Sequence, residues 1–152
     1  MYQRLFSTLL AILAVFAAPR TALGQERGAA ALEQLVRGLP VNARVLIIGA
    51  HPDDEDTQLI AWLARGHQVH TAYLSLTRGD GGQNIIGTEL GESLGAIRSA
   101  ELLAARTIDG GEQFFSRAYD FGYSKTLDDT WQHWLRDSIL KDVVRVIRQF
   151  QP

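Results

Sequence analysis

The sequence predicts an α/β fold with a mainly parallel β-sheet, and three observations support this prediction. Short apolar runs of β-type residues alternate with longer segments of helical periodicity. A strand, a helix and a second strand fit within residues 44–76, which is the length of a right-handed βαβ unit. The segment Arg44–Ala50 is almost entirely apolar, as expected of a strand that is buried on both faces. This pattern is typical of a Rossmann-like, three-layer α/β/α domain.

The first 24 residues have the features of a signal peptide. Arg4 supplies the positive charge, Leu5–Ala18 is the apolar region, and Ala22-Leu23-Gly24 places small residues at a cleavage site. The apolar region has 14 residues, fewer than the roughly 20 that span a bilayer, which favours cleavage over membrane anchoring. We therefore expect a secreted or periplasmic protein that begins at Gln25.

Residues 25–42 are expected to form an N-terminal helix, Gly28–Gly38, and a linker. After the first strand, Pro52 suits the first turn of a helix, and the acids that follow it suit the positive end of the helix dipole. This helix is predicted to run to about Ala64 and to stop at Gly66. Gln68–Leu76 is predicted to be the second strand.

The remaining elements continue the alternation of helices and strands. We expect a helix over Glu89–Ala105, a short strand over Glu112–Ser116, and one long helix from Thr130 onward. A strand should follow that helix in an α/β pattern, so residues 43–152 are expected to be the N-terminal part of a domain that is incomplete at its C-terminus.

Composition excludes several classes of protein. The net charge is −2, with 15 basic and 17 acidic residues and no basic stripe, which argues against nucleic acid as a partner. The chain has no cysteine, which removes disulfides, thiolate ligands and thiolate nucleophiles from consideration.

Chemistry-bearing residues follow the first two predicted strands. His51 and four consecutive acids, Asp53–Asp56, follow the first strand; Arg78, Asp80 and Gln83 follow the second. Ligands of open α/β sheets bind outside the carboxyl ends of the strands, so both groups should share one edge of the sheet. A bound cation would relieve the repulsion between neighbouring acids, and imidazole with carboxylate suits zinc. Spacing alone does not decide which of Asp53 and Asp54 is a ligand and which a general base.

Three segments resemble the LmbE-like, or PIG-L, family of zinc-dependent N-deacetylases. They are Gly49-Ala50-His51-Pro52-Asp53-Asp54-Glu55, Thr77-Arg78-Gly79-Asp80-Gly81-Gly82 and Ala96-Ile97-Arg98-Ser99-Ala100-Glu101-Leu102. The resemblance implies removal of an acetyl group from an N-acetylglucosamine-type sugar, a glycoconjugate or a related amide. It makes His51 and Asp54 ligands of Zn²⁺, with Fe²⁺ as the alternative metal, and makes Asp53 the general base. Arg98 would contact the substrate, and Arg78, Asp80 and Gln83 would border its pocket.

The resemblance also implies a third ligand, a histidine in a later His-x-x-His-like segment. His67 and His70 have this spacing, but they lie at the start of the predicted second strand, opposite the expected site, so this chain is expected to hold zinc poorly and to lack activity as it stands. A non-catalytic sugar- or metal-binding domain with the same fold is the first alternative. A magnesium-dependent phosphoacceptor domain is the second; it needs another aspartate after a later strand, and the region after Glu112 offers no convincing one. His51 also fits zinc better than magnesium.

Overall fold

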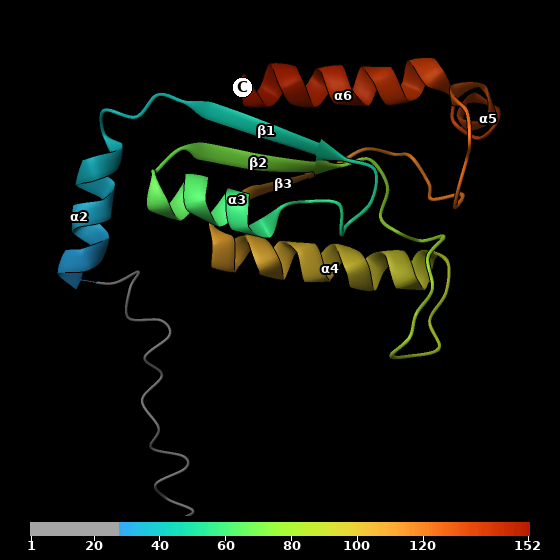
Figure 1. The fold of residues 1–152 in the computed structure, drawn as a ribbon, viewed down its shortest axis with the longest axis horizontal. Helices are drawn as coiled ribbons and strands as arrows, with labels where there is room; N and C mark the ends of the chain where they lie inside the picture. Colours follow the sequence, from blue (N-terminus) through green and yellow to red (C-terminus); the bar gives the residue numbers. More distant parts are fainter. Residues whose placement is uncertain (1–27) are drawn as a thin grey trace, which may run out of the picture. The chain divides into compact units, whose positions relative to one another are not determined.

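A computed structural model describes residues 28–152 of the chain (Figure 1). The chain divides into two units, Met1–Val36 and Arg37–Pro152. Helix α2 (Gly28–Gly38) matches the predicted N-terminal helix and lies mostly in the first unit. The expected signal peptide falls outside the described residues. No helix in the described part of the chain is long and apolar enough to cross a membrane.

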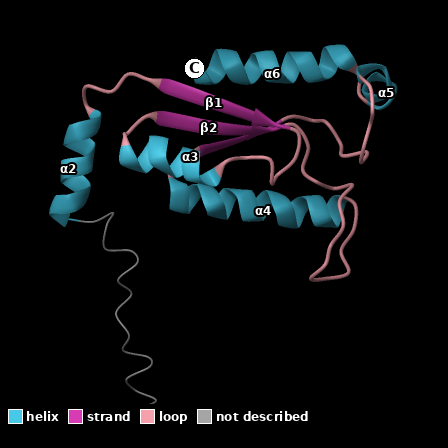
Figure 2. Cartoon of the chain, viewed as in Figure 1, coloured by secondary structure: helices cyan, strands magenta, loops and turns pink. Residues whose placement is uncertain are grey.

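The second unit is built on a parallel sheet of three strands in the order β1-β2-β3. The strands are β1 (Arg44–Gly49), β2 (His70–Ser75) and β3 (Glu112–Phe115). Helices cover both faces: α3 (Thr57–Ala61) and α4 (Glu92–Asp109) lie on one face, and α6 (Arg136–Phe150) lies on the other (Figures 1 and 2). The predicted α/β/α fold with a parallel sheet is therefore confirmed.

Alternation of side chains along the strands builds the core on both faces of the sheet. Tyr73 packs with Ile60 and Leu102 on the α3 and α4 face, with Phe115 beside them. Phe114, the neighbour of Phe115, instead makes an edge contact with Phe150 of α6. Ile139 and Val146 of α6 are also buried.

The predicted start of the first helix after β1 was wrong. Residues 51–56 form a loop, and α3 begins at Thr57 with Asp56 as its N-cap, whose side chain accepts a hydrogen bond of 2.9 Å from the Leu59 N–H. A π-helical turn, η2 (Trp62–Gly66), completes this helical segment at the predicted glycine. The acids 53–55 therefore lie before the helix and not in its first turn.

The single long helix predicted from Thr130 was also wrong. The segment forms α5 (Leu127–His133) and α6, separated by Trp134 and Leu135 in extended conformations. The indole N–H of Trp134 donates a 2.8 Å hydrogen bond to the carbonyl of Tyr119. This contact with a distant loop fixes Trp134 at the point where the helix is interrupted.

Candidate active site at the carboxyl edge of the sheet

The carboxyl ends of all three strands are aligned. Gly49 is paired with Ser75, and Ser75 with Phe115, so each strand ends at the same level. The three loops that follow, residues 50–56, 76–91 and 116–126, therefore start at one edge of the sheet. This edge is where sequence analysis expected the site.

The loop that carries His51 is fixed by hydrogen bonds to its backbone. One oxygen of Asp54 accepts hydrogen bonds from the backbone N–H groups of Ala50 (2.9 Å) and His51 (2.8 Å). The Tyr73 hydroxyl donates a hydrogen bond of 2.5 Å to the carbonyl of His51. Burial, followed by the charges of Glu55 and Asp54, raises the pKa of Tyr73, so its hydroxyl remains a neutral donor. The loop is therefore held in place by β2 beneath it.

The four consecutive acids of this loop have four different partners. Asp54 faces the His51 ring, with Oδ2 at 3.4 Å from Nδ1. Asp53 is 70 % exposed and pairs at 3.2 Å with Arg98 of α4. Glu55 points inward and forms a buried ion pair at 3.2 Å with Arg106 of α4, while Asp56 caps α3. The crowding that suggested a cation is thus relieved largely by protein partners, and only Asp54 stands beside His51.

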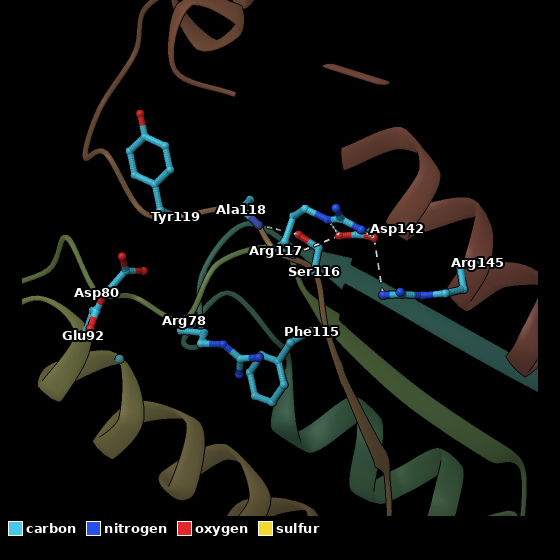
Figure 3. Close-up of a pocket in the computed structure, with 11 residues that line it drawn as sticks. Arg78, Asp80, Glu92, Phe115, Ser116, Arg117, Ala118, Tyr119, Asp142 and Arg145 are labelled. Carbon is cyan, nitrogen blue, oxygen red and sulfur yellow. Dashed lines mark hydrogen bonds and ion pairs between the residues drawn. The ribbon is translucent and has the colours of Figure 1, made fainter. Parts of the chain in front are cut away.

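The residues expected to bind substrate lie in more than one cavity. Arg78 and Asp80 line the largest of the cavities described, of about 560 Å³, together with Tyr119 and side chains of α6 (Figure 3). Gln83 lines a separate cavity of about 350 Å³, which it shares with Arg98. Arg98 also borders a third cavity, of about 200 Å³, beside Asp53. Arg98 is therefore the predicted substrate-binding residue that lies against the proposed base.

Ion pairs line the α6 side of the cavity that contains Arg78 and Asp80. Asp142 is buried and receives hydrogen bonds of 2.8 Å from Nε and Nη2 of Arg117. Arg145 forms a second ion pair with this carboxylate, at 3.4 Å. Figure 3 marks the contact with a dashed line. Across the cavity, the Arg78 guanidinium stacks on Phe115 at 4.3 Å from the ring centre and donates to the hydroxyl of Ser99. The arginines of this cavity are thus already engaged by protein groups.

Asp120 belongs to this site although sequence analysis did not select it. It lies in the loop after β3, and its Oδ1 is 3.5 Å from Nε2 of His51. Its backbone N–H donates to Oδ1 of Asp80 at 3.2 Å. The sequence could have indicated Asp120. Ligands bind outside the carboxyl ends of the strands, and this rule, which selected residues after the first two strands, applies equally to the loop after the third. The statement that no convincing aspartate follows Glu112 was therefore wrong.

His51 and Asp54 fit two positions of a zinc site. With bonds of 2.0–2.2 Å, two ligands of a tetrahedral zinc lie roughly 3.3–3.6 Å apart, a range that includes the 3.4 Å between Nδ1 and Oδ2. A catalytic zinc usually has about three protein ligands and one position for water. In residues 28–152, no group of three or more His, Cys, Asp or Glu side chains is arranged to hold a metal ion. Of the described residues, His51 and Asp54 would hold such an ion, and they are two of the usual three ligands.

The comparison with family models agrees with the fold and the motif. The family model described as "PIG-L: GlcNAc-PI de-N-acetylase" matches residues 46–152, which include most of β1, all three loops and α6. The comparison with curated proteins gave no match. Members of this family are generally deacetylases or other amide hydrolases, and they are typically zinc-dependent. On the extent of this match, the chain belongs to the PIG-L family of de-N-acetylases.

Proposed function

We propose that this chain carries part of the active site of a zinc-dependent hydrolase that removes the acetyl group from an N-acetylglucosamine-type sugar or a related amide. The observation that supports this most directly is the pairing of His51 Nδ1 with Asp54 Oδ2 at 3.4 Å, next to Asp53 in sequence, at the carboxyl edge of the sheet. His51 and Asp54 would hold the zinc, with Fe²⁺ as the alternative metal.

The neighbouring side chains have positions that suit hydrolysis of an amide. Zinc held by His51 and Asp54 would supply Lewis-acid chemistry and would make water a stronger acid at this position. Asp53 is exposed and lies next to the ligand in sequence, so its carboxylate can take a proton from the attacking water and return it to the leaving amine. Arg98 holds that carboxylate at 3.2 Å and is itself mostly buried, which fixes the direction from which Asp53 acts.

The substrate-binding part of the proposal rests on the loop after β2. Asp80 lines the largest cavity and is tied to Asp120, which faces His51. Arg78 lines the same cavity, and Gln83 lies with Arg98 in the smaller one. We propose that these polar side chains contact the hydroxyl groups of a small-molecule amino sugar or glycoconjugate.

The test is acetate release from N-acetylglucosamine derivatives by the protein expressed from its whole gene, so that any later third ligand is included, with its metal content measured in parallel. We expect activity to depend on zinc, and Asp53→Asn to lose about 10²- to 10⁴-fold in kcat while it retains the metal. Asp128→Asn changes an acid in the first turn of α5 and is the matched control. It should leave kcat and metal content unchanged. Activity in the metal-free chain would reject the mechanism.

A non-catalytic sugar- or metal-binding domain remains the second candidate, because the described residues provide only two of the usual ligands. Zinc binding without acetate release from any of the derivatives would favour this alternative. The same measurements therefore separate the two functions.

We further propose that residues 1–24 direct export and that residues 43–152 are the deacetylase-like domain. Sequencing the N-terminus of the protein after expression with its leader should find Gln25 first. Retention of Met1 would contradict cleavage at Gly24.

A further inference from the structure

The His51 ring lies between two carboxylates, and each approaches a different nitrogen. Asp54 Oδ2 is 3.4 Å from Nδ1, and Asp120 Oδ1 is 3.5 Å from Nε2. The lone pairs of the two ring nitrogens diverge, so one metal ion cannot use both. Only one of the two carboxylates can therefore bind the same metal ion as His51. The other faces the ring nitrogen that does not bind the metal.

The exposure of the two carboxylates differs strongly. The side chain of Asp54 is 43 % exposed and that of His51 is 36 % exposed, whereas Asp120 is only 7 % exposed. A hydrolytic metal needs an open position for water and substrate, which the accessible Nδ1 side provides. A buried carboxylate on the other side is suited to accept an N–H from the ring.

Asp120 is itself held firmly by its surroundings. Its Oδ1 accepts a 2.8 Å hydrogen bond from the N–H of Gly122, and its own N–H donates to Asp80. Gly81 lies so close that a Cβ atom there would overlap the carbonyl of Asp120. The bond from Trp134 to the carbonyl of Tyr119 fixes the preceding residue. These contacts give Asp120 a defined position against His51.

We propose that Asp120 is a positioning residue for His51. Its carboxylate accepts the proton on Nε2, which fixes the ring in the tautomer whose Nδ1 lone pair faces Asp54 and is available to the metal. Metal-binding histidines usually donate their second ring N–H to such a partner. The inference rests on the proposed function, in which His51 is a ligand, but its first test needs no metal.

The first test is the tautomer of His51 in the metal-free protein, measured by long-range ¹H–¹⁵N NMR at about pH 8, above the ordinary pKa of histidine. His51→Gln assigns the signals, since the chain has only four histidines. We expect a protonated Nε2 and an unprotonated Nδ1 in the wild type and in Asp120→Asn, whose amide oxygen still accepts the N–H. Asp120→Ala should give a mixture of tautomers. A wild-type ring protonated on Nδ1 would overturn the inference.

The second test is the affinity for Zn²⁺, with the absorption spectrum of bound Co²⁺ as a probe of coordination. We expect Asp120→Ala to weaken binding about 10- to 100-fold and Asp120→Asn to retain most of the affinity, with the Co²⁺ spectrum unchanged in shape. Asp128→Asn should match the wild type. Equal losses in Asp120→Ala and Asp120→Asn with an altered spectrum would make Asp120 a direct ligand and overturn its positioning role.

The two proposals fail in different ways. A wild-type chain with the expected tautomer that binds neither Zn²⁺ nor Co²⁺ would contradict the proposed function. A wild-type chain that binds zinc equally well with and without the Asp120 side chain would contradict only the role of Asp120.

Discussion

At the scale of single residues, Gly49 and Tyr73 set the position of the His51 loop. Gly49 is the last residue of β1, and a Cβ atom there would overlap the Tyr73 hydroxyl and lie 2.8 Å from the Cβ of Asp54. The same hydroxyl donates to the carbonyl of His51. The absence of a side chain at Gly49 therefore lets a buried tyrosine of β2 reach the loop that carries the proposed ligands.

Gly49→Ala should consequently destabilise the protein by about 1–3 kcal/mol, the usual cost of overpacking. In a Tyr73→Phe background the hydroxyl is gone, so we expect the same substitution to cost measurably less. Urea unfolding of the two single variants and the double variant measures this coupling. Equal costs in both backgrounds would show that the tyrosine hydroxyl is not the obstacle.

Asp142 provides a second prediction at this scale, concerning pH. Hydrogen bonds from Arg117 lower the pKa of Asp142 from 3.8 to about 2 in the folded protein. A lowered folded-state pKa contributes stability that is present above pH 3.8 and is lost as the pH falls towards 2. Stability measured by urea unfolding should decline across this interval, and less steeply in Asp142→Asn. Parallel profiles for the two proteins would contradict this assignment.

At the scale of elements, the sequence predicted the strands better than the helix boundaries. β1, β2 and β3 lie within their predicted ranges. The apolar composition of β1 located the strand but not its burial: β1 lies at the edge of the described sheet and Ile48 is 46 % exposed, so the expected burial on both faces was wrong. The central strand β2 is buried from Thr71 to Ser75. Pro52 and the acids after it satisfy the rules for a helix start, yet they form a loop. Contacts with distant residues, Tyr73 with His51 and Arg106 with Glu55, decide this outcome, and periodicity carries no information about them.

Contacts between distant residues also explain why Asp120 was not predicted to be part of the site. His51 and Asp54 were found because they directly follow a recognisable strand, and they do lie together. Asp120 stands in an aromatic loop after a strand of only four residues, where the sequence pattern is weak. Its place beside His51 depends on the parallel pairing of β3 with β2 and on the Trp134 contact that interrupts the last helices.

The ion pair between Glu55 of the His51 loop and Arg106 of α4 leads to a prediction about stability. Arg106 is buried and lies 3.2 Å from Glu55 and 2.7 Å from Asp109, although only the contact with Glu55 has hydrogen-bond geometry. Arg106→Met would leave two buried carboxylates without a cation and should cost about 3–5 kcal/mol. Glu55→Gln leaves Arg106 paired with Asp109 and should cost less, about 1–3 kcal/mol.

Chemical denaturation of Arg106→Met and Glu55→Gln tests whether the first substitution lowers the free energy of unfolding more than the second. Glu112→Gln, which alters the exposed pair with His70 at the opposite end of the sheet, is the control and should change stability by less than about 0.5 kcal/mol. A larger loss of unfolding free energy in Glu55→Gln than in Arg106→Met would contradict the role of Arg106 as the cation that neutralises both Glu55 and Asp109.

At the scale of the whole molecule, the two ends of the sheet differ in what they can bind. The carboxyl end joins three loops around His51, whereas His70 at the amino end of β2 pairs with Glu112, packs against the Phe150 ring and is half exposed. A ligand that binds only the folded state raises the free energy of unfolding by RT ln(1 + [L]/Kd). Zinc binding at the proposed site should therefore be visible in global stability, independently of any enzymatic assay.

We expect the free energy of unfolding to rise with Zn²⁺ concentration, by about 2.7 kcal/mol at 100 times the dissociation constant. His51→Ala should abolish this dependence because it removes the imidazole ligand, while His70→Ala should retain it because that ring lies at the far end of the strands. Thermal and urea unfolding at several zinc concentrations measure the effect. Stabilisation that survives in His51→Ala but disappears in His70→Ala would move the metal to the other end of the sheet, away from Asp53, and the proposed hydrolase would lose its metal site.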